Sequence, residues 1–243
     1  MKKVDIFIKS YHKDFKLLNY SLQSIAKNVT GYNNIILLIP EREKHLFDTR
    51  HMPDRTLIHY VKEYGSGYLF QQWCKITAHK YSDADFIMFS DSDCIFDHEI
   101  NLQDFVKDEK PEILYTDYSK VGDAICWKQP TVDVIKMPVQ YEFMWRNCLI
   151  YHKSTLINIE KFEPNLEYVI MTGERFSEFN VIGAYAFNYE RENYNFINTD
   201  NWTYTEPKGI QLWSLATKDN ENGEYQRIID TLNNVFEIHL TEL

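Results

Sequence analysis

The chain has 243 residues, 44% of them hydrophobic, which suits one large α/β domain or two small ones with a proper core. Its 36 acidic residues outnumber its 26 basic ones, and the net charge of −10 argues against non-specific binding to a polyanion. The four cysteines form no C-x-x-C pair, so a zinc knuckle or redox motif is not expected and reduced thiols predict a cytoplasmic protein. The opening segment does not resemble a signal peptide, and no apolar run of 18 residues predicts a membrane span.

The first half alternates short apolar runs with segments of helical periodicity. In the first helical segment, Phe15, Leu18, Leu22 and Ile25 are spaced three and four residues apart, and Asp14 is the expected N-cap. Strand–helix alternation with right-handed crossovers predicts a Rossmann-like, mostly parallel sheet flanked by helices. The predicted elements are strands at 4–9, 34–40, 56–63 and 85–90, and helices at 14–29, 41–48 and 67–81.

The second half is less regular. Ser177 is the expected start of a helix, which follows the flexible-looking segment 167–176. No repeat or Pro/Gly linker divides the chain, so we expect a single domain, 1–243, with one lobe at about 1–117 and a second, irregular lobe at about 118–243. The predicted elements are strands at 112–118, 194–199 and 235–240, helices at 177–190 and 223–234, and a strand running into a helix at 145–162.

Two aspartates, Asp91 and Asp93, end the apolar run at 85–90. In parallel sheets, ligands bind beyond the carboxyl ends of the strands, and a buried carboxylate without a partner is costly. Carboxylate oxygens suit Mg²⁺ or Mn²⁺, and such an ion in turn binds the phosphates of a nucleotide. The chain lacks a complete G-x-G-x-x-G motif, because "GSG" at 65–67 has Phe70 in place of the third glycine. We therefore expect a cation, rather than a glycine-rich turn, to bind the phosphates.

Other readings of this D-x-D remain open. A calcium loop is excluded, because it would need Asp or Asn at Ile95 and Gly at Phe96. A haloacid-dehalogenase-like phosphatase would use Asp91 as nucleophile in D-x-D-x-[T/V], which "DSDCI" misses only at Ile95, but that motif normally closes the first strand of its domain. A non-catalytic nucleotide- or glycan-binding module is a further alternative, and an aspartate after a strand can also be a plain helix cap.

Three stretches carry a family resemblance: "DIFIKSYHKDFKLLNYSLQSI", "GYLFQQWCKITAHKYSDADFIMFSDSDCIF" and "RFSEFNVIGAYAF". Together they resemble GT-A fold glycosyltransferases, in particular the DUF6492-like group of bacterial and phage glycosyltransferases. That group shows a Q-Q-x-x-K helix, a D-x-D strand end and an S-E-[FY]-x-x-[IY]-G-x-Y segment. The resemblance implies a mixed, mostly parallel sheet, with the lobe at about 1–117 binding the nucleotide and the irregular lobe at about 118–243 binding the acceptor. It also implies transfer of a sugar from a nucleotide-sugar donor, expected to be a UDP-sugar, with Mn²⁺ or Mg²⁺ as cofactor. The acceptor would be a glycan, a protein or a modified base.

The resemblance also implies roles for individual residues. Asp93 would bind the metal directly, and Asp91 would contact the metal or the donor ribose. A late histidine, His239, is the expected third metal ligand, with His152 and His98 as weaker candidates. The donor-binding residues that it implies are Ser10, Tyr11, Gln72, Lys75 and Asp91.

Glu178 is the expected catalytic base, which would deprotonate the acceptor hydroxyl. Its position just after Ser177 also fits a simple helix-end charge, because the helix dipole favours an anion there. Glu174 competes for the catalytic role.

Overall fold

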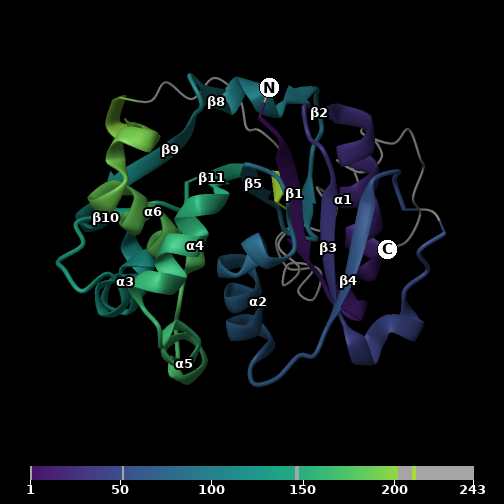
Figure 1. The fold of residues 1–243 in the computed structure, drawn as a ribbon, viewed down its shortest axis with the longest axis horizontal. Helices are drawn as coiled ribbons and strands as arrows, with labels where there is room; N and C mark the ends of the chain where they lie inside the picture. Colours follow the sequence, from purple (N-terminus) through teal and green to yellow (C-terminus); the bar gives the residue numbers. More distant parts are fainter. Residues whose placement is uncertain (1, 51, 146–147, 202–209, 212–243) are drawn as a thin grey trace.

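The computed structural model describes residues 2–50, 52–145, 148–201 and 210–211 (Figure 1). Its main sheet has five strands in the order β11-β5-β1-β3-β4, in which β11 is antiparallel to β5 and the other neighbours are parallel. The prediction of a mixed, mostly parallel sheet flanked by helices is therefore confirmed. The elements up to the D-x-D are β1 (Val4–Lys9), η1 (His12–Asp14), α1 (Phe15–Asn28), β2 (Val29–Thr30), β3 (Ile35–Pro40), η2 (Glu41–Leu46), β4 (Thr56–Val61), α2 (Gly67–Ile76), η3 (Ala78–Lys80) and β5 (Phe86–Phe89).

Alternate residues of the central strands face two separate cores. In β1, Ile6 and Ile8 pack with Leu18 and Leu22 of α1, whereas Phe7 packs on the other face with Phe70 of α2. Successive strand side chains point to opposite faces of a sheet, so a strand covered on both faces is apolar on both faces over most of its length. This explains why the sequence shows continuous apolar runs rather than alternating ones.

The second half builds a smaller sheet and a helical layer beside α2 (Figure 1). The two halves are interleaved, because β9 begins before residue 117 but pairs with β10 and β12, while β11 joins the main sheet. The remaining elements are β6 (Cys94–Ile95), β7 (Ile100–Asn101), η4 (Leu102–Phe105), β8 (Val106–Lys107), β9 (Lys110–Asp117), η5 (Tyr118–Lys120), η6 (Gly122–Trp127), α3 (Lys128–Ile135), β10 (Tyr141–Glu142), β11 (Leu149–His152), α4 (Lys153–Phe162), α5 (Leu166–Thr172), α6 (Glu178–Tyr189), η7 (Arg191–Asn193), β12 (Asn195–Asn198), η8 (Thr199–Asn201) and β13 (Ile210–Gln211).

Several local predictions need correction. The helix expected over 67–81 ends at Ile76, where the Thr77 hydroxyl donates to the carbonyl of Trp73 and the chain tightens into η3. The segment 167–176, expected to be flexible, contains most of α5. Asp14 occupies the N-cap position of α1 but makes no side-chain cap hydrogen bond. The predicted helix at 223–234 and strand at 235–240 lie outside the described residues.

Ser177 caps α6 as predicted, because its side chain accepts a hydrogen bond from the backbone N–H of Asn180. Helix α3 was not predicted, because Pro130 in its first turn is a residue that usually argues against a helix. Proline is tolerated there, where its missing N–H would have no intrahelical partner. Among the helices of the described residues, none combines the length and the apolar character that crossing a membrane requires.

Candidate functional site

Several of the predicted site residues within the described part of the chain, among them Ser10, Lys75 and Asp91, lie at the carboxyl ends of β1 and β5. These neighbouring parallel strands pair with Phe7 opposite Phe89, so the residues that follow them leave the sheet close together. The hydroxyl of Ser92 donates to that of Ser10 at 3.0 Å, and both residues are buried. Ser10 is thus beside the D-x-D, while its role in donor binding stays a prediction.

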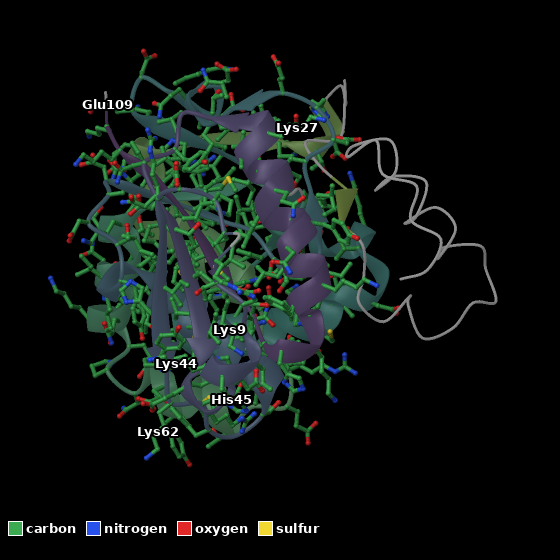
Figure 2. The ribbon with its side chains drawn as sticks, turned by 90° about the vertical axis from the view of Figure 1, so that its right-hand side faces the viewer. Lys9, Lys27, Lys44, His45, Lys62 and Glu109 are labelled. Atoms are coloured by element: carbon green, nitrogen blue, oxygen red, sulfur yellow. The ribbon has the colours of Figure 1, made fainter. Side chains whose placement is uncertain are left out.

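Figure 2 orients this edge on the molecule. Lys9, the last residue of β1, marks the carboxyl end of the parallel strands, whereas Lys27 and Glu109 mark the opposite end. Lys44 and His45, from the segment that follows β3, lie at the same end as Lys9. The D-x-D therefore lies at the end of the sheet where parallel α/β proteins bind their ligands.

Asp91 is held through one of its two carboxylate oxygens. Its Oδ1 accepts a hydrogen bond from Gln71 Nε2 at 2.9 Å and forms an ion pair with Lys75 Nζ at 2.8 Å. No described residue donates to Oδ2. The side chain remains 24% exposed, so one oxygen fixes the carboxylate and the other is open to a ligand.

Lys75 connects Asp91 to Glu178. Its Nζ lies 2.8 Å from Asp91 Oδ1 and 2.8 Å from Glu178 Oε1, and 4.6 Å from the centre of the Phe179 ring. The lysine and glutamate side chains are only 2% and 3% exposed. One buried ammonium between two carboxylates therefore ties together α2, the end of β5 and the start of α6, and leaves one net negative charge.

The electrostatics of this group favour a charged lysine. Burial alone would lower the pKa of Lys75, but Asp91 and Glu178 outweigh burial and raise that pKa. Burial raises the pKa of Glu178, and the charge of Lys75 acts in the opposite direction.

Gln72 has a different neighbour from the one the sequence suggested. Its Oε1 accepts the backbone N–H of Glu178 at 3.1 Å, and the residue is buried. It thus satisfies an N–H at the start of α6 that has no partner within the helix. The residue that contacts the D-x-D is instead Gln71, which sequence reasoning missed. The spacing could have found it, because Gln71 and Lys75 are four residues apart and share a helix face.

Tyr11 follows Ser10 and is partly buried. Burial raises the pKa of its hydroxyl, and nearby Asp14 adds to the effect. Lys9 lies 5.9 Å from the centre of the Tyr11 ring and pairs with Glu63 at 3.1 Å. Arg42 also pairs with Glu63, at 2.5 Å. These charged groups near the ends of β1 and β4 were missed, although a lysine ending an otherwise apolar strand is a usable signal.

Asp91 and Asp93 fit a divalent ion that takes most of its ligands from elsewhere. Asp93 is nearly buried in the turn before β6. Burial raises the pKa of the Cys94 thiol, and the charges of Asp91 and Asp93 raise that pKa further. Both carboxylates are therefore close enough to Cys94 to affect its thiol. Mg²⁺ and Mn²⁺ take oxygen ligands, and Mg²⁺ is usually held by one or two carboxylates together with waters and substrate phosphates.

A third metal ligand is not found in the part of the chain that is described. No group of three or more His, Cys, Asp and Glu side chains suited to a metal occurs there. His98 pairs with Asp97, and His152 contacts the carbonyl of Asn193. His239, the expected ligand, lies outside the described residues, so its role stays a prediction.

A pocket of about 370 Å³ lies between η6, α3 and the segment that joins α5 to α6. Phe176 in its wall is two residues before Glu178, and its carbonyl accepts a hydrogen bond from Tyr68. Arg175 Nη1 lies 3.8 Å from Cys126 Sγ in the same lining. The lining residues are Cys126, Gln129, Pro130, Asp133, Val169, Gly173, Glu174, Arg175 and Phe176.

Comparison of the chain with protein-family models and with curated proteins gives no match. The resemblance to GT-A fold glycosyltransferases therefore stays a prediction that rests on the three motifs and on the geometry around Asp91.

Proposed function

We propose that the protein is a metal-dependent glycosyltransferase of the GT-A type, which moves a sugar from a nucleotide-sugar donor to an acceptor hydroxyl. The observation that carries this proposal is the state of Asp91. Its carboxylate follows a buried parallel strand two residues before Asp93, and among the described residues its donors, Gln71 and Lys75, contact Oδ1 and not Oδ2. This is the donor set that a hard divalent cation uses when a diphosphate completes its coordination.

In this proposal Asp91 and Asp93 hold Mg²⁺ or Mn²⁺. When bound, the metal would stabilise the negative charge on the departing nucleoside diphosphate. Ser10 and Tyr11, at the end of β1, would line the nucleoside side. Lys75 would keep Asp91 in place, because its ammonium and the Gln71 amide leave that carboxylate little freedom to rotate.

The acceptor would approach from the side of α6. The pocket beside Phe176 supports this, because its lining combines apolar residues with the polar side chains of Gln129, Asp133, Glu174 and Arg175. A pocket of this lining suits a polar ligand with several hydroxyl groups. Glu178 remains the proposed base. Its carboxylate is bound to Lys75 in this conformation, and it must leave that contact to reach an acceptor.

A thermal-shift experiment with UDP or a UDP-sugar tests the metal assignment. At a free ligand concentration 100-fold above Kd, binding stabilises the folded state by about 2.7 kcal/mol, and EDTA should abolish the shift. Asp93→Asn should fold but lose the shift, whereas Asp97→Asn, a more exposed aspartate outside the motif, should keep it. Equal shifts for wild type and Asp93→Asn would remove Asp93 from the metal site.

The phosphatase alternative predicts a different intermediate on the same aspartate. A glycosyltransferase should release a nucleoside diphosphate from its donor and form no covalent phosphate. Beryllium fluoride that mimics an aspartyl-phosphate on Asp91, seen as a stable adduct lost in Asp91→Asn, would support the phosphatase instead. Binding of nucleotide without donor hydrolysis or transfer would favour the non-catalytic module.

A further inference from the structure

Asp91 of the D-x-D forms an ion pair with a lysine of the same chain. Lys75 Nζ lies 2.8 Å from the carboxylate of Asp91, and the lysine side chain is 2% exposed. Its second partner, Glu178, is equally buried, so the ammonium is fixed rather than free to swing into solvent. A divalent ion on Asp91 would therefore share one carboxylate with a permanent positive charge.

This arrangement affects cation binding in two ways. The first is that Oδ1 of Asp91 already receives two donors, Gln71 Nε2 and Lys75 Nζ, so the carboxylate offers a metal only Oδ2. The second is repulsion, because like charges at close range in a partly buried site oppose each other more strongly than they do in water. Both effects lower the affinity of Asp91 and Asp93 for a bare cation.

We propose that Lys75 is a resident counter-cation: its charge keeps the affinity of Asp91 and Asp93 for a bare divalent ion low, so that the ion binds together with an anionic diphosphate, while the Gln71 amide also holds Asp91 in place. The diphosphate supplies both the missing oxygen ligands and the negative charge that offsets the lysine. Because binding linkage is reciprocal, the nucleotide must raise metal affinity by the same factor by which the metal raises nucleotide affinity. This inference rests on the proposed function.

A purely structural ion pair makes the opposite prediction. If Lys75 only joins α2 to α6, its removal misplaces Asp91, and cation binding weakens or stays the same. If Lys75 is a counter-cation, its removal tightens the binding of the bare cation. The sign of the change therefore separates the two roles.

The test compares Glu178→Gln with the double variant Lys75→Met/Glu178→Gln. Lysine loss alone would leave the buried Glu178 carboxylate without its partner, which is strongly destabilising. Because both proteins carry the Glu178→Gln substitution, they differ only in the ammonium. Mn²⁺ alone is titrated into each by calorimetry after melting curves without metal establish that both are folded. If the methionine variant does not fold, Lys75→Gln/Glu178→Gln replaces it, because a glutamine amide can still donate to Asp91.

We expect the double variant to bind Mn²⁺ about 10-fold tighter than Glu178→Gln. In the presence of UDP at a fixed concentration, Mn²⁺ affinity should rise in wild type and Glu178→Gln by a larger factor than in the double variant. Equal or weaker Mn²⁺ binding in the double variant would overturn the counter-cation role, while loss of Mn²⁺ binding in Asp93→Asn would still uphold the metal site. A wild-type protein that binds no Mn²⁺ even with UDP would overturn both proposals.

Discussion

Lys75 determines what each carboxylate around it can do. One carboxylate oxygen of Asp91 contacts Lys75 and Gln71, and the other has no donor among the described residues. The carboxylate of Glu178 is buried and forms an ion pair with Lys75. Two acidic residues that both have a predicted role in the site therefore differ in their access to a ligand. Asp91 can meet a ligand directly, and Glu178 must first exchange its partner.

Glu178→Gln tests the proposed base. We expect donor affinity to change little, because glutamine can still accept the hydrogen bond from Lys75, while sugar transfer falls by about 10²- to 10⁴-fold for a lost general base. Transfer rate and urea unfolding are measured on the same preparation. Normal turnover with a loss of about 1.5–3 kcal/mol in the free energy of unfolding, typical of a hydrogen bond to a charged group, would remove Glu178 from catalysis. Glu174 in the neighbouring pocket would then be the next acid to test.

Glu142 provides a pH-dependent prediction. It is buried on β10, and burial raises the pKa of its carboxyl above the usual value, although Met144 N–H donates to it at 2.8 Å. A raised folded-state pKa means that the folded state binds more protons than the unfolded state. Stability is therefore lost as pH rises from the unfolded pKa through the folded one, and the ionised form carries the full penalty above that range.

Glu142→Gln removes this penalty and keeps a carbonyl that can accept from Met144. We expect the variant to be more stable than wild type at pH 8, with the difference shrinking as pH falls toward 4. Urea unfolding at pH 4, 6 and 8 measures it, with Glu192→Gln, an exposed position, as the control. A stability difference that does not depend on pH would contradict the assignment.

Helix α6 connects the site to the rest of the second half through a close contact at Gly183. A Cβ built on Gly183 would lie 2.4 Å from Phe143 Cγ and 2.5 Å from Phe143 Cβ, distances that packed atoms do not reach. The glycine therefore lets α6 lie directly against the segment after β10. The start of the helix, with Ser177 and Glu178, is positioned by this packing.

Gly183→Ala should destabilise the protein although alanine is the better helix former. The intrinsic gain is about 1 kcal/mol, whereas forcing Phe143 aside costs typically about 1–3 kcal/mol. Gly67→Ala is the control, because Gly67 also belongs to a helix but its nearest atom, Glu63 Oε1, lies at 3.8 Å. Thermal and urea unfolding compare the two variants. A Gly183→Ala protein more stable than wild type would show that Phe143 moves without cost.

At the scale of the whole molecule, the two halves of the chain share their sheets. β11 completes the main sheet beside β5, while β9 serves as the middle strand of the smaller sheet. One apolar cluster runs from Phe7 in β1 to Tyr194 near the end of the described chain. Residues on both sides of position 117 therefore contribute to one core.

This interleaving predicts that residues 1–117 do not fold alone. Without β11 and the helices α3, α4 and α6, the apolar strand β5 would form an exposed edge and one face of the sheet would lose its cover. The fragment is expected to show no cooperative urea transition, while the full chain shows one. Circular dichroism and tryptophan fluorescence follow both proteins. A cooperative transition of the fragment would mean that the first lobe is an independent unit.

The first half of the fold could be predicted because its signals are local. β1 matches the predicted strand residue for residue, and β3, β4 and β5 agree to within two residues at each end. Apolar runs and three- to four-residue spacing are properties of neighbouring residues, so they can be read without a tertiary structure. The second half was harder, because α3 and α5 depend on packing rather than on a regular pattern.

By itself the sequence determined the parallel strands of the first half and the placement of Asp91 and Asp93 at a strand end, because both follow from patterns within a few residues. Only the tertiary structure decided which neighbours those aspartates have. Glu178 lies far beyond Asp91 in the chain, and no local pattern could bring Lys75 within 2.8 Å of both. Whether a carboxylate is open to a ligand or held by a buried lysine depends on such long-range contacts, and burial and charge partners set its chemistry.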